Sequence, residues 1–264
     1  MVEELGVKLF YNKTFGKDVT EESLKKDGYE MIFVGSGLNA PKAELGKDAY
    51  MLPNVLSSKS FLPNVCENVK LSKSKEKIFK LKGHVIVLGI GDTALDCARS
   101  AIRVGADKVT VIFRRGFNDM RANDEIFHPA TYDRINFISN LTPSQVIKDK
   151  GVAVAMEFDQ YFTDEKGEYK LTGEKIKFNC DYIISAFGSK NDQPEIAGLV
   201  RDANQRICID RYTMQNKNKP HIFAGGDIIG TNNLVDAVND GKVASWFMHK
   251  EIGKKHGINY GDKP

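Results

Sequence analysis

A glycine-rich turn at residues 89–94 is the part of this sequence that points most directly to chemistry. It reads Gly-Ile-Gly-Asp-Thr-Ala, the pattern G-x-G-x-x-A, and it follows the apolar run at 85–88. The first glycine of this pattern allows a tight turn, the second lets the backbone approach a pyrophosphate, and the alanine permits close packing of helix on strand. The next helix offers free N–H groups and a positive dipole end to the phosphates. We therefore predict a dinucleotide site formed by Gly89, Ile90, Gly91, Asp92, Thr93 and Ala94, although a ligand-free turn is the alternative.

The end of the next apolar run indicates which dinucleotide is bound. An acidic residue there would accept a hydrogen bond from a ribose 2′-hydroxyl, but this sequence has Phe-Arg-Arg-Gly at 113–116. Arginine is always charged, and its planar guanidinium matches a phosphate group. We therefore predict NADPH rather than NADH, with Arg114 and Arg115 on the 2′-phosphate and Arg121 closing the same pocket. Surface ion pairs are the alternative for these arginines.

Alternating strand and helix patterns surround these residues. The apolar runs 85–88 and 109–113 are typical of parallel strands buried on both faces, and apolar residues at helical spacing connect them over 92–104. Two further apolar runs, 29–35 and 182–188, also lead into glycine turns. This repetition predicts an α/β fold of two interleaved Rossmann-like dinucleotide-binding units. We place the inserted unit at 83–188 and the other at 1–82 and 189–264.

The remaining segments give coarser expectations. We expect a short strand at 6–11, a helix capped by Thr20 and ending near Lys26, and loop over most of 38–62. The lysine-rich stretch 70–82 is interpreted as a solvated linker rather than a phosphate-attracting patch. An antiparallel excursion is expected at 152–180, a strand at 221–224 and a long amphipathic helix at 234–255.

Composition excludes several classes of protein. A net charge of only +3 argues against nucleic-acid binding through bulk electrostatics, and no apolar run approaches the roughly 20 residues of a membrane span. The first residues show no secretory signal. The four cysteines form no C-x-x-C pair, so we expect neither a metal site nor an iron–sulfur cluster in this chain. A soluble, cytoplasmic, reduced protein without nucleic-acid or membrane partners is predicted, with Cys97 a small buried residue.

Longer stretches resemble a known group of enzymes. The segment GIGDTALDCARSAIRVGADKVTVIFRRG at 89–116 resembles the NADPH domain shared by glutamate synthase small subunits and dihydropyrimidine dehydrogenases. HIFAGGDIIG at 221–230, followed by VDAVNDGKVASWFMHKEI, resembles the flavin motif of the same group. FRRGFNDMRA, DYIISAFGS and VNDGKVASWFMHK are most similar to the dihydropyrimidine dehydrogenase family. Glutamate synthase relatives tend to have proline at the position of Arg121.

This resemblance implies the cofactors and their sites. NADPH would pass a hydride to FAD without a catalytic side chain, because the cofactors carry the chemistry. The NADPH site would add three residues to those above: Ala186, Phe187 and Gly188. Asp227 would hold the ribityl chain of FAD. The flavin site would comprise Phe15, Gly226, Asp227, Ile228, Ile229, Gly230, Thr231, Asn232, Asn233, Leu234 and Val235.

The resemblance also implies a larger parent enzyme. Cysteine-rich iron–sulfur segments, a first flavin glycine motif and an FMN-bearing barrel, where uracil or thymine is reduced to a 5,6-dihydropyrimidine, are expected outside these 264 residues. The chain would then be a central piece, inactive alone, of a homodimeric parent, with 1–82 and 189–264 forming part of its FAD-binding domain. Two alternatives remain: a glutamate synthase small-subunit-like NADPH:flavin oxidoreductase, and a non-catalytic NADP-binding module.

Overall fold

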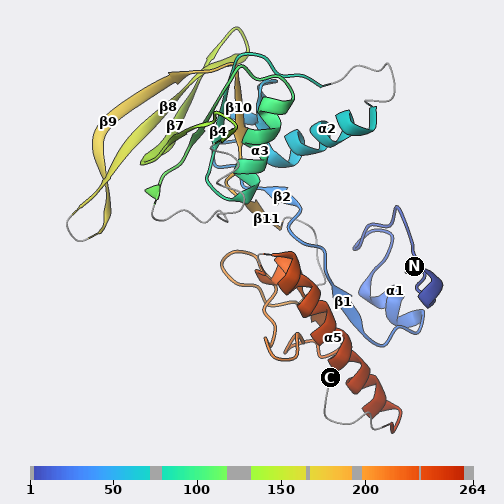
Figure 1. The fold of residues 1–264 in the computed structure, drawn as a ribbon. Coiled ribbons are helices and arrows are strands. Elements are labelled where there is room, and N and C mark those ends of the chain that lie inside the picture. Colours follow the sequence, from blue (N-terminus) through green and yellow to red (C-terminus); the bar gives the residue numbers. More distant parts are fainter. Residues whose placement is uncertain are drawn as a thin grey trace. The chain divides into compact units, whose positions relative to one another are not determined.

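The chain forms two compact units, which the computed structural model describes over residues 3–71, 79–117, 132–164, 167–191, 198–231 and 233–258 (Figure 1). Unit 1 comprises Met1–Ala40 and Lys190–Pro264, and unit 2 comprises Pro41–Ser189. The predicted α/β fold with one unit inserted into the other is therefore confirmed. The return boundary lies where we expected it, whereas the first boundary lies at residues 40–41 instead of 82–83.

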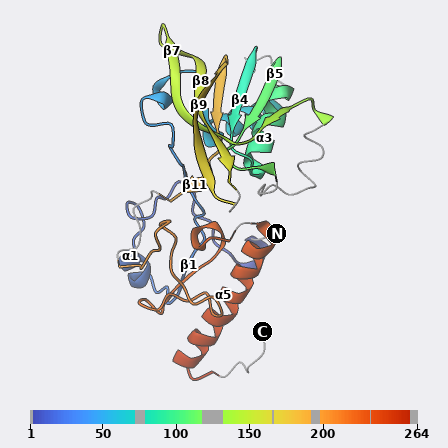
Figure 2. The ribbon, with the colours of Figure 1, turned by 90° about the vertical axis from the view of Figure 1, so that its left-hand side faces the viewer.

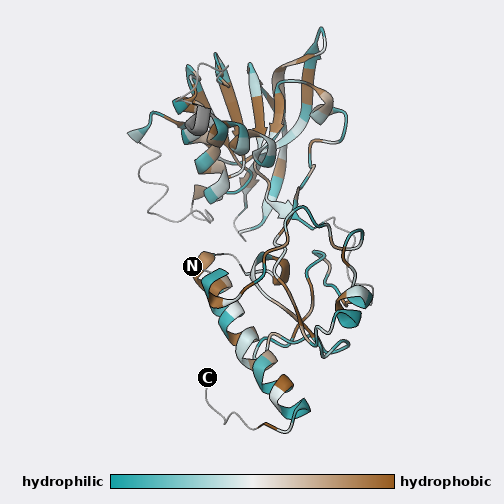
Figure 3. Ribbon diagram, turned by 90° about the vertical axis from the view of Figure 1, so that its right-hand side faces the viewer, coloured by the Kyte–Doolittle hydropathy of each residue, from teal (hydrophilic) through white to brown (hydrophobic). Residues whose placement is uncertain are grey.

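A parallel sheet forms the centre of unit 2. Its strand order is β3 (Val55–Ser57), β10 (Tyr182–Ser185), β4 (His84–Leu88), β5 (Lys108–Ile112) and β6 (Asn136–Ile138). Helices α2 (Ser58–Leu71) and α3 (Asp92–Arg103) cover one face, where Phe61, Val87 and Leu95 are fully buried. The sheet strands are strongly apolar in Figure 3, as burial on both faces requires.

An antiparallel sheet covers the other face of this parallel sheet (Figure 2). It consists of β7 (Leu141–Asp149), β8 (Val152–Thr163) and β9 (Tyr169–Asn179), in that order, which confirms the expected antiparallel excursion. Phe158 and Met156 of β8 pack against Ile86 and Ile183 of the parallel strands. The unit thus has three layers, and its central sheet is shielded from water on both faces.

Unit 1 is organised around a short parallel pair of strands. Strands β1 (Ile32–Val34) and β12 (Ile222–Ala224) pair in register, and the helix α5 (Leu234–Lys255) and the 3₁₀ turn η4 (Gly226–Ile229) pack beside them. Helix α1 (Glu21–Lys26) begins with the predicted Thr20 cap, which forms a capping box because Thr20 and Ser23 bond reciprocally. The long C-terminal helix also has the predicted bounds.

The shorter elements complete the described chain. They are η1 (Glu3–Leu5), β2 (Ala40–Pro41), η2 (Ala49–Met51) and β11 (Ser189–Lys190). Strands β2 and β11 pair with each other. No helix among the described residues is both long and apolar enough to cross a bilayer.

Two local expectations were wrong. Residues 6–11 form no strand, and Phe10 and Tyr11 are 67% and 73% exposed. An alternating pattern is not sufficient for a strand, because a strand also needs a neighbouring strand to pair with. The expected loop at 38–62 ends early, because residues 55–57 form β3, which pairs with β10, and because Ser57 and Ser60 exchange backbone-to-hydroxyl hydrogen bonds at the start of α2. That pairing and that helix attach residues 41–71 to unit 2, which explains the earlier boundary. Residues 72–78 of the expected linker lie outside the described part.

Candidate dinucleotide-binding site

The turn between β4 and α3 has the backbone shape that the glycine pattern predicts. Gly89 has φ of +120°, and a Cβ there would lie 2.6 Å from the carbonyl oxygen of Ala186 on the neighbouring chain segment. Gly91 is the N-cap of α3, and a Cβ there would meet no atom within 4 Å. Ala94 is fully buried against the sheet. Gly89 is therefore required by the protein itself, whereas Gly91 leaves free space in front of a helix N-terminus.

A cavity of about 420 Å³ opens at this turn, at the carboxyl ends of β4, β5 and β10. This is the edge of a parallel sheet where open α/β folds bind their ligands. The cavity lies entirely within unit 2. Its lining consists of Glu44, Gly89, Ile90, Gly91, Thr93, Ile112, Phe113, Arg114, Arg115, Leu141, Thr142, Pro143, Ala186, Phe187 and Gly188.

Most of the predicted nucleotide-site residues meet in this cavity, from three separate segments of the chain. Asp92 and Ala94 do not line it, because the alanine packs inward and Asp92 lies on an exposed part of the first helical turn. Arg121 lies outside the described residues. The sequence reasoning missed Glu44 and the residues 141–143, since no local motif connects them to the turn.

The two arginines give the cavity a positive end. Arg114 and Arg115 follow directly after Phe113 at the end of β5, and both side chains are exposed. Within the described part of the chain, no carboxylate forms an ion pair with either guanidinium. The ion-pair alternative therefore has no support among these residues.

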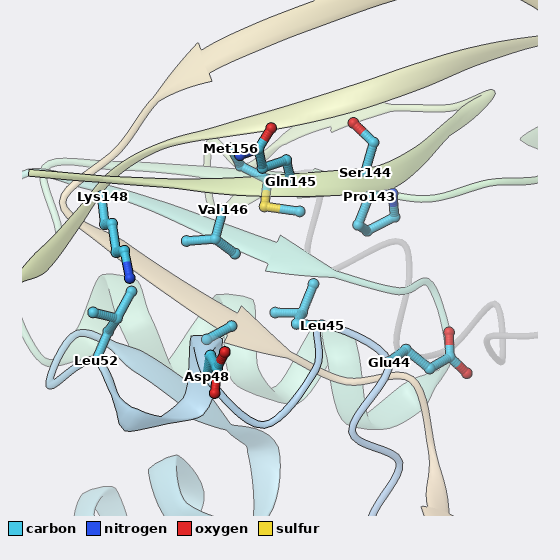
Figure 4. Close-up of a pocket in the computed structure, with 11 residues that line it drawn as sticks. Glu44, Leu45, Asp48, Leu52, Pro143, Ser144, Gln145, Val146, Lys148 and Met156 are labelled. Carbon is cyan, nitrogen blue, oxygen red and sulfur yellow. The ribbon is translucent and has the colours of Figure 1, made fainter.

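A second cavity, of about 340 Å³, lies beside the first and shares Glu44 and Pro143 with it (Figure 4). Leu45, Leu52, Val146 and Met156 supply apolar lining, and Asp48 and Lys148 carry charges. In Figure 4 the carboxylate of Glu44 points away from these apolar residues. Glu44 thus lies between the second cavity and the nucleotide cavity, and it lines both.

The turn after β12 in unit 1 carries the predicted flavin residues. Gly226 and Gly230 have φ of +76° and +91°, and a Cβ on Gly225 would lie 2.7 Å from Cβ of Asp240. The buried Asp240 carboxylate, 6% exposed, accepts hydrogen bonds from the Gly226 N–H (2.9 Å) and the Thr231 hydroxyl (2.6 Å). Asp240 of α5 therefore holds the two ends of the turn in place, a role that no motif indicated.

The individual flavin candidates differ in exposure. Asp227 is exposed at the turn, whereas Ile228 and Ile229 are buried in the core and could contribute only backbone groups. Asn233 caps α5 by accepting a hydrogen bond from the Asp236 N–H at 2.8 Å. Leu234 and Val235 are 79% and 78% exposed in the first turn of that helix.

The other candidates add no reactive group. Phe15 is half-buried and forms an isolated bridge with Val19, so its place in a flavin site stays a prediction. Asn232 lies outside the described residues. Cys97 is fully buried, and burial raises the pKa of its thiol to about 12, as burial also does for Cys180. These two thiols remain protonated at neutral pH and are not nucleophiles.

Fold and site together define an α/β nucleotide-binding module of an oxidoreductase. Residues 3–246 match the family described as pyridine nucleotide-disulphide oxidoreductase, and the chain belongs to that family. Family membership supports NAD(P) and flavin binding, together with the two-domain Rossmann-type fold described above.

Curated relatives agree with this assignment. The chain is 30% identical over 258 residues to the glutamate synthase [NADPH] small chain of Halomonas elongata, covering 92% of this chain and 54% of that one. It is 28% identical over 255 residues to the NADP(+)-dependent formate dehydrogenase subunit beta of Moorella thermoacetica, covering 92% and 34%. It thus spans between about a third and a half of these relatives. The predicted relation to glutamate synthase small chains is confirmed, and neither relative is a dihydropyrimidine dehydrogenase.

Solved structures share the fold. Mycobacterium tuberculosis FprA in complex with NADPH has a TM-score of 0.67 at 14% identity, over 96% of this chain and 70% of that chain. Thioredoxin reductase of Lactococcus lactis has a TM-score of 0.63 at 24% identity, over 85% and 66%. At these identities the likeness shows the fold alone.

Proposed function

We propose that this chain is the electron-input portion of a dihydropyrimidine dehydrogenase, which binds NADPH and part of FAD so that a hydride passes between them. The observation that carries the NADPH part is the cavity of unit 2, which joins an open glycine turn to two exposed arginines that form no ion pair with any described residue. The pyrimidine part is supported by the sequence stretches 113–122, 181–189 and 238–250. It would make uracil or thymine the final electron acceptor in the full-length enzyme.

The residues of the nucleotide cavity fit NADPH. The free space at Gly91 and the N–H groups of the first turn of α3 suit a pyrophosphate. Arg114 and Arg115 would donate hydrogen bonds to a 2′-phosphate. The nicotinamide half would lie against the residues that follow the neighbouring strand β10, which are Ala186, Phe187 and Gly188.

The turn at Gly226 fits a flavin in the same way. A Cβ on Gly226 would meet only Cβ of Ala237 among described atoms, at 3.7 Å, so the turn is open on one side. Asp227 would accept hydrogen bonds from ribityl hydroxyls, and the N-terminus of α5 would face the ring system. When bound, the two cofactors supply the hydride chemistry, and this chain orients them and requires no acid or base of its own.

The wider proposal concerns the parent protein. We propose that iron–sulfur clusters and FMN are carried by other parts of the same polypeptide, that the parent is a cytoplasmic homodimer, and that it has no nucleic-acid or membrane partner. The second candidate, a glutamate synthase small-subunit-like oxidoreductase, is favoured by the 30% identity over 92% of the chain. A non-catalytic NADP-binding module is the third.

Steady-state assays of the full-length protein distinguish these functions. We expect NADPH oxidation to require uracil or thymine and not glutamine with 2-oxoglutarate. Dependence on glutamine and 2-oxoglutarate would support the glutamate synthase candidate and overturn ours. NADPH binding without flavin reduction would support the non-catalytic module.

A further inference from the structure

We infer that Glu44 is a specificity-determining residue at the nicotinamide end of the cavity, where its carboxylate favours oxidised NADP⁺ over NADPH. This inference rests on the proposed NADPH site and adds to it a residue that distinguishes the two redox forms. Its basis is the juxtaposition, in one cavity, of Glu44 and the residues that follow β10.

Sheet order fixes which half of the dinucleotide lies near Glu44. The pyrophosphate belongs at the turn after β4, and the arginines of the 2′-phosphate follow β5 on one side. Strand β10 lies on the opposite side of β4. A dinucleotide extended across the strand ends must therefore place its nicotinamide half over residues 186–188.

Several contacts attach the segment of Glu44 to that same end. The Lys42 N–H donates to the Gly188 carbonyl at 3.0 Å, two residues before Glu44. Tyr50 donates its hydroxyl to Ser185 Oγ of β10 at 2.8 Å. Burial raises the pKa of this tyrosine, and the nearby negative charge of Glu44 raises it further. Glu44 is therefore beside the end of β10.

The carboxylate of Glu44 is free to act on a ligand. Its side chain is exposed, and within the described residues no cation or hydrogen-bond donor pairs with it. In Figure 4 it points away from the apolar lining of the second cavity. By contrast, Asp48 lines that second cavity and not the nucleotide cavity.

The two redox forms differ in charge at the nicotinamide ring. The ring is neutral in NADPH and carries a positive charge in NADP⁺, after a hydride with its two electrons has left for the flavin. A nearby carboxylate attracts the oxidised ring and has little Coulomb interaction with the reduced one. Glu44 would thus stabilise bound NADP⁺, the product that remains after NADPH has donated its hydride.

Equilibrium binding to the 264-residue chain tests the inference. NADPH is titrated by its fluorescence and NADP⁺ by calorimetry, for wild type, Glu44→Gln and the matched control Asp48→Asn. Exposed charge pairs contribute up to about 1 kcal/mol, so Glu44→Gln should weaken NADP⁺ about threefold to fivefold. NADPH affinity should change by less than about 1.5-fold, and Asp48→Asn should alter neither.

Equal changes for both forms in Glu44→Gln, or no change, would overturn the inference while leaving the NADPH site intact. An equal loss of NADP⁺ affinity in Asp48→Asn would also overturn it, because the loss would then follow from the net charge of the protein and not from the position of Glu44. If wild type binds neither cofactor, the proposed function fails and this inference fails with it.

Discussion

Replacing each glycine of the turn by alanine should separate the residue that the fold needs from the residue that the nucleotide needs. At Gly89 an alanine would hold φ near +120°, and its Cβ would lie 2.6 Å from the Ala186 carbonyl oxygen. At Gly91 φ is −85°, which alanine adopts without strain, and its Cβ would face open space.

The structure gives the size of each effect. An unfavourable φ costs about 1–3 kcal/mol, and a backbone clash costs a similar amount, while alanine regains at most about 1 kcal/mol by restricting the unfolded chain. We expect Gly89→Ala to lower the free energy of unfolding by about 3 kcal/mol. For a unit of this size that is a fall in Tm of about 6–12 °C. Gly91→Ala should change Tm by less than about 2 °C, because losing a glycine N-cap and stiffening the unfolded chain roughly cancel.

Thermal unfolding and NADPH titration of the same samples make the comparison. Gly91→Ala should bind NADPH at least about tenfold more weakly than wild type, because its methyl group would occupy the space of the pyrophosphate. Wild-type affinity in Gly91→Ala would refute the assignment of this turn to the phosphates. A Gly89→Ala variant as stable as wild type would refute the geometry of the turn.

Three further predictions concern the other charged groups. Arg114→Ala should weaken NADPH binding by about 1.5–3 kcal/mol and leave NADH nearly unchanged, and equal losses in fluorescence titrations would show that this arginine does not contact the 2′-phosphate. After incubation with excess FAD and removal of the free flavin, the 264-residue chain should show little flavin absorbance, and one bound flavin per chain would contradict this. In the full-length protein, Asp227→Ala should lower the flavin content. Burial would raise the pKa of Glu21, but its bonds to Lys219, Lys25 and His221 outweigh burial and lower it to about 2. Unit 1 should therefore lose stability as pH falls from about 4.5 toward 2 in acid titrations followed by circular dichroism, and Glu21→Gln should flatten this dependence.

Local sequence was enough to predict the βαβ turn and the long C-terminal helix. Residues 85–113 contain two apolar runs, a glycine pattern and a helical repeat in succession, and each depends on neighbours in the chain. The same holds for α1, whose cap involves residues three apart. The local patterns placed six of the residues that line the nucleotide cavity, and the family resemblance added Ala186, Phe187 and Gly188.

Tertiary structure alone decided where unit 2 begins and what completes its cavity. Strand β3 has only three residues, too few for a periodic pattern, and it exists because Ile183 and Ile184 of β10 pair with Val55 and Leu56. Glu44 enters the nucleotide cavity because this pairing and the Lys42–Gly188 hydrogen bond bring its segment to the end of β10. Contacts between residues more than a hundred positions apart leave no trace in local propensity, so only the folded chain brings these groups together.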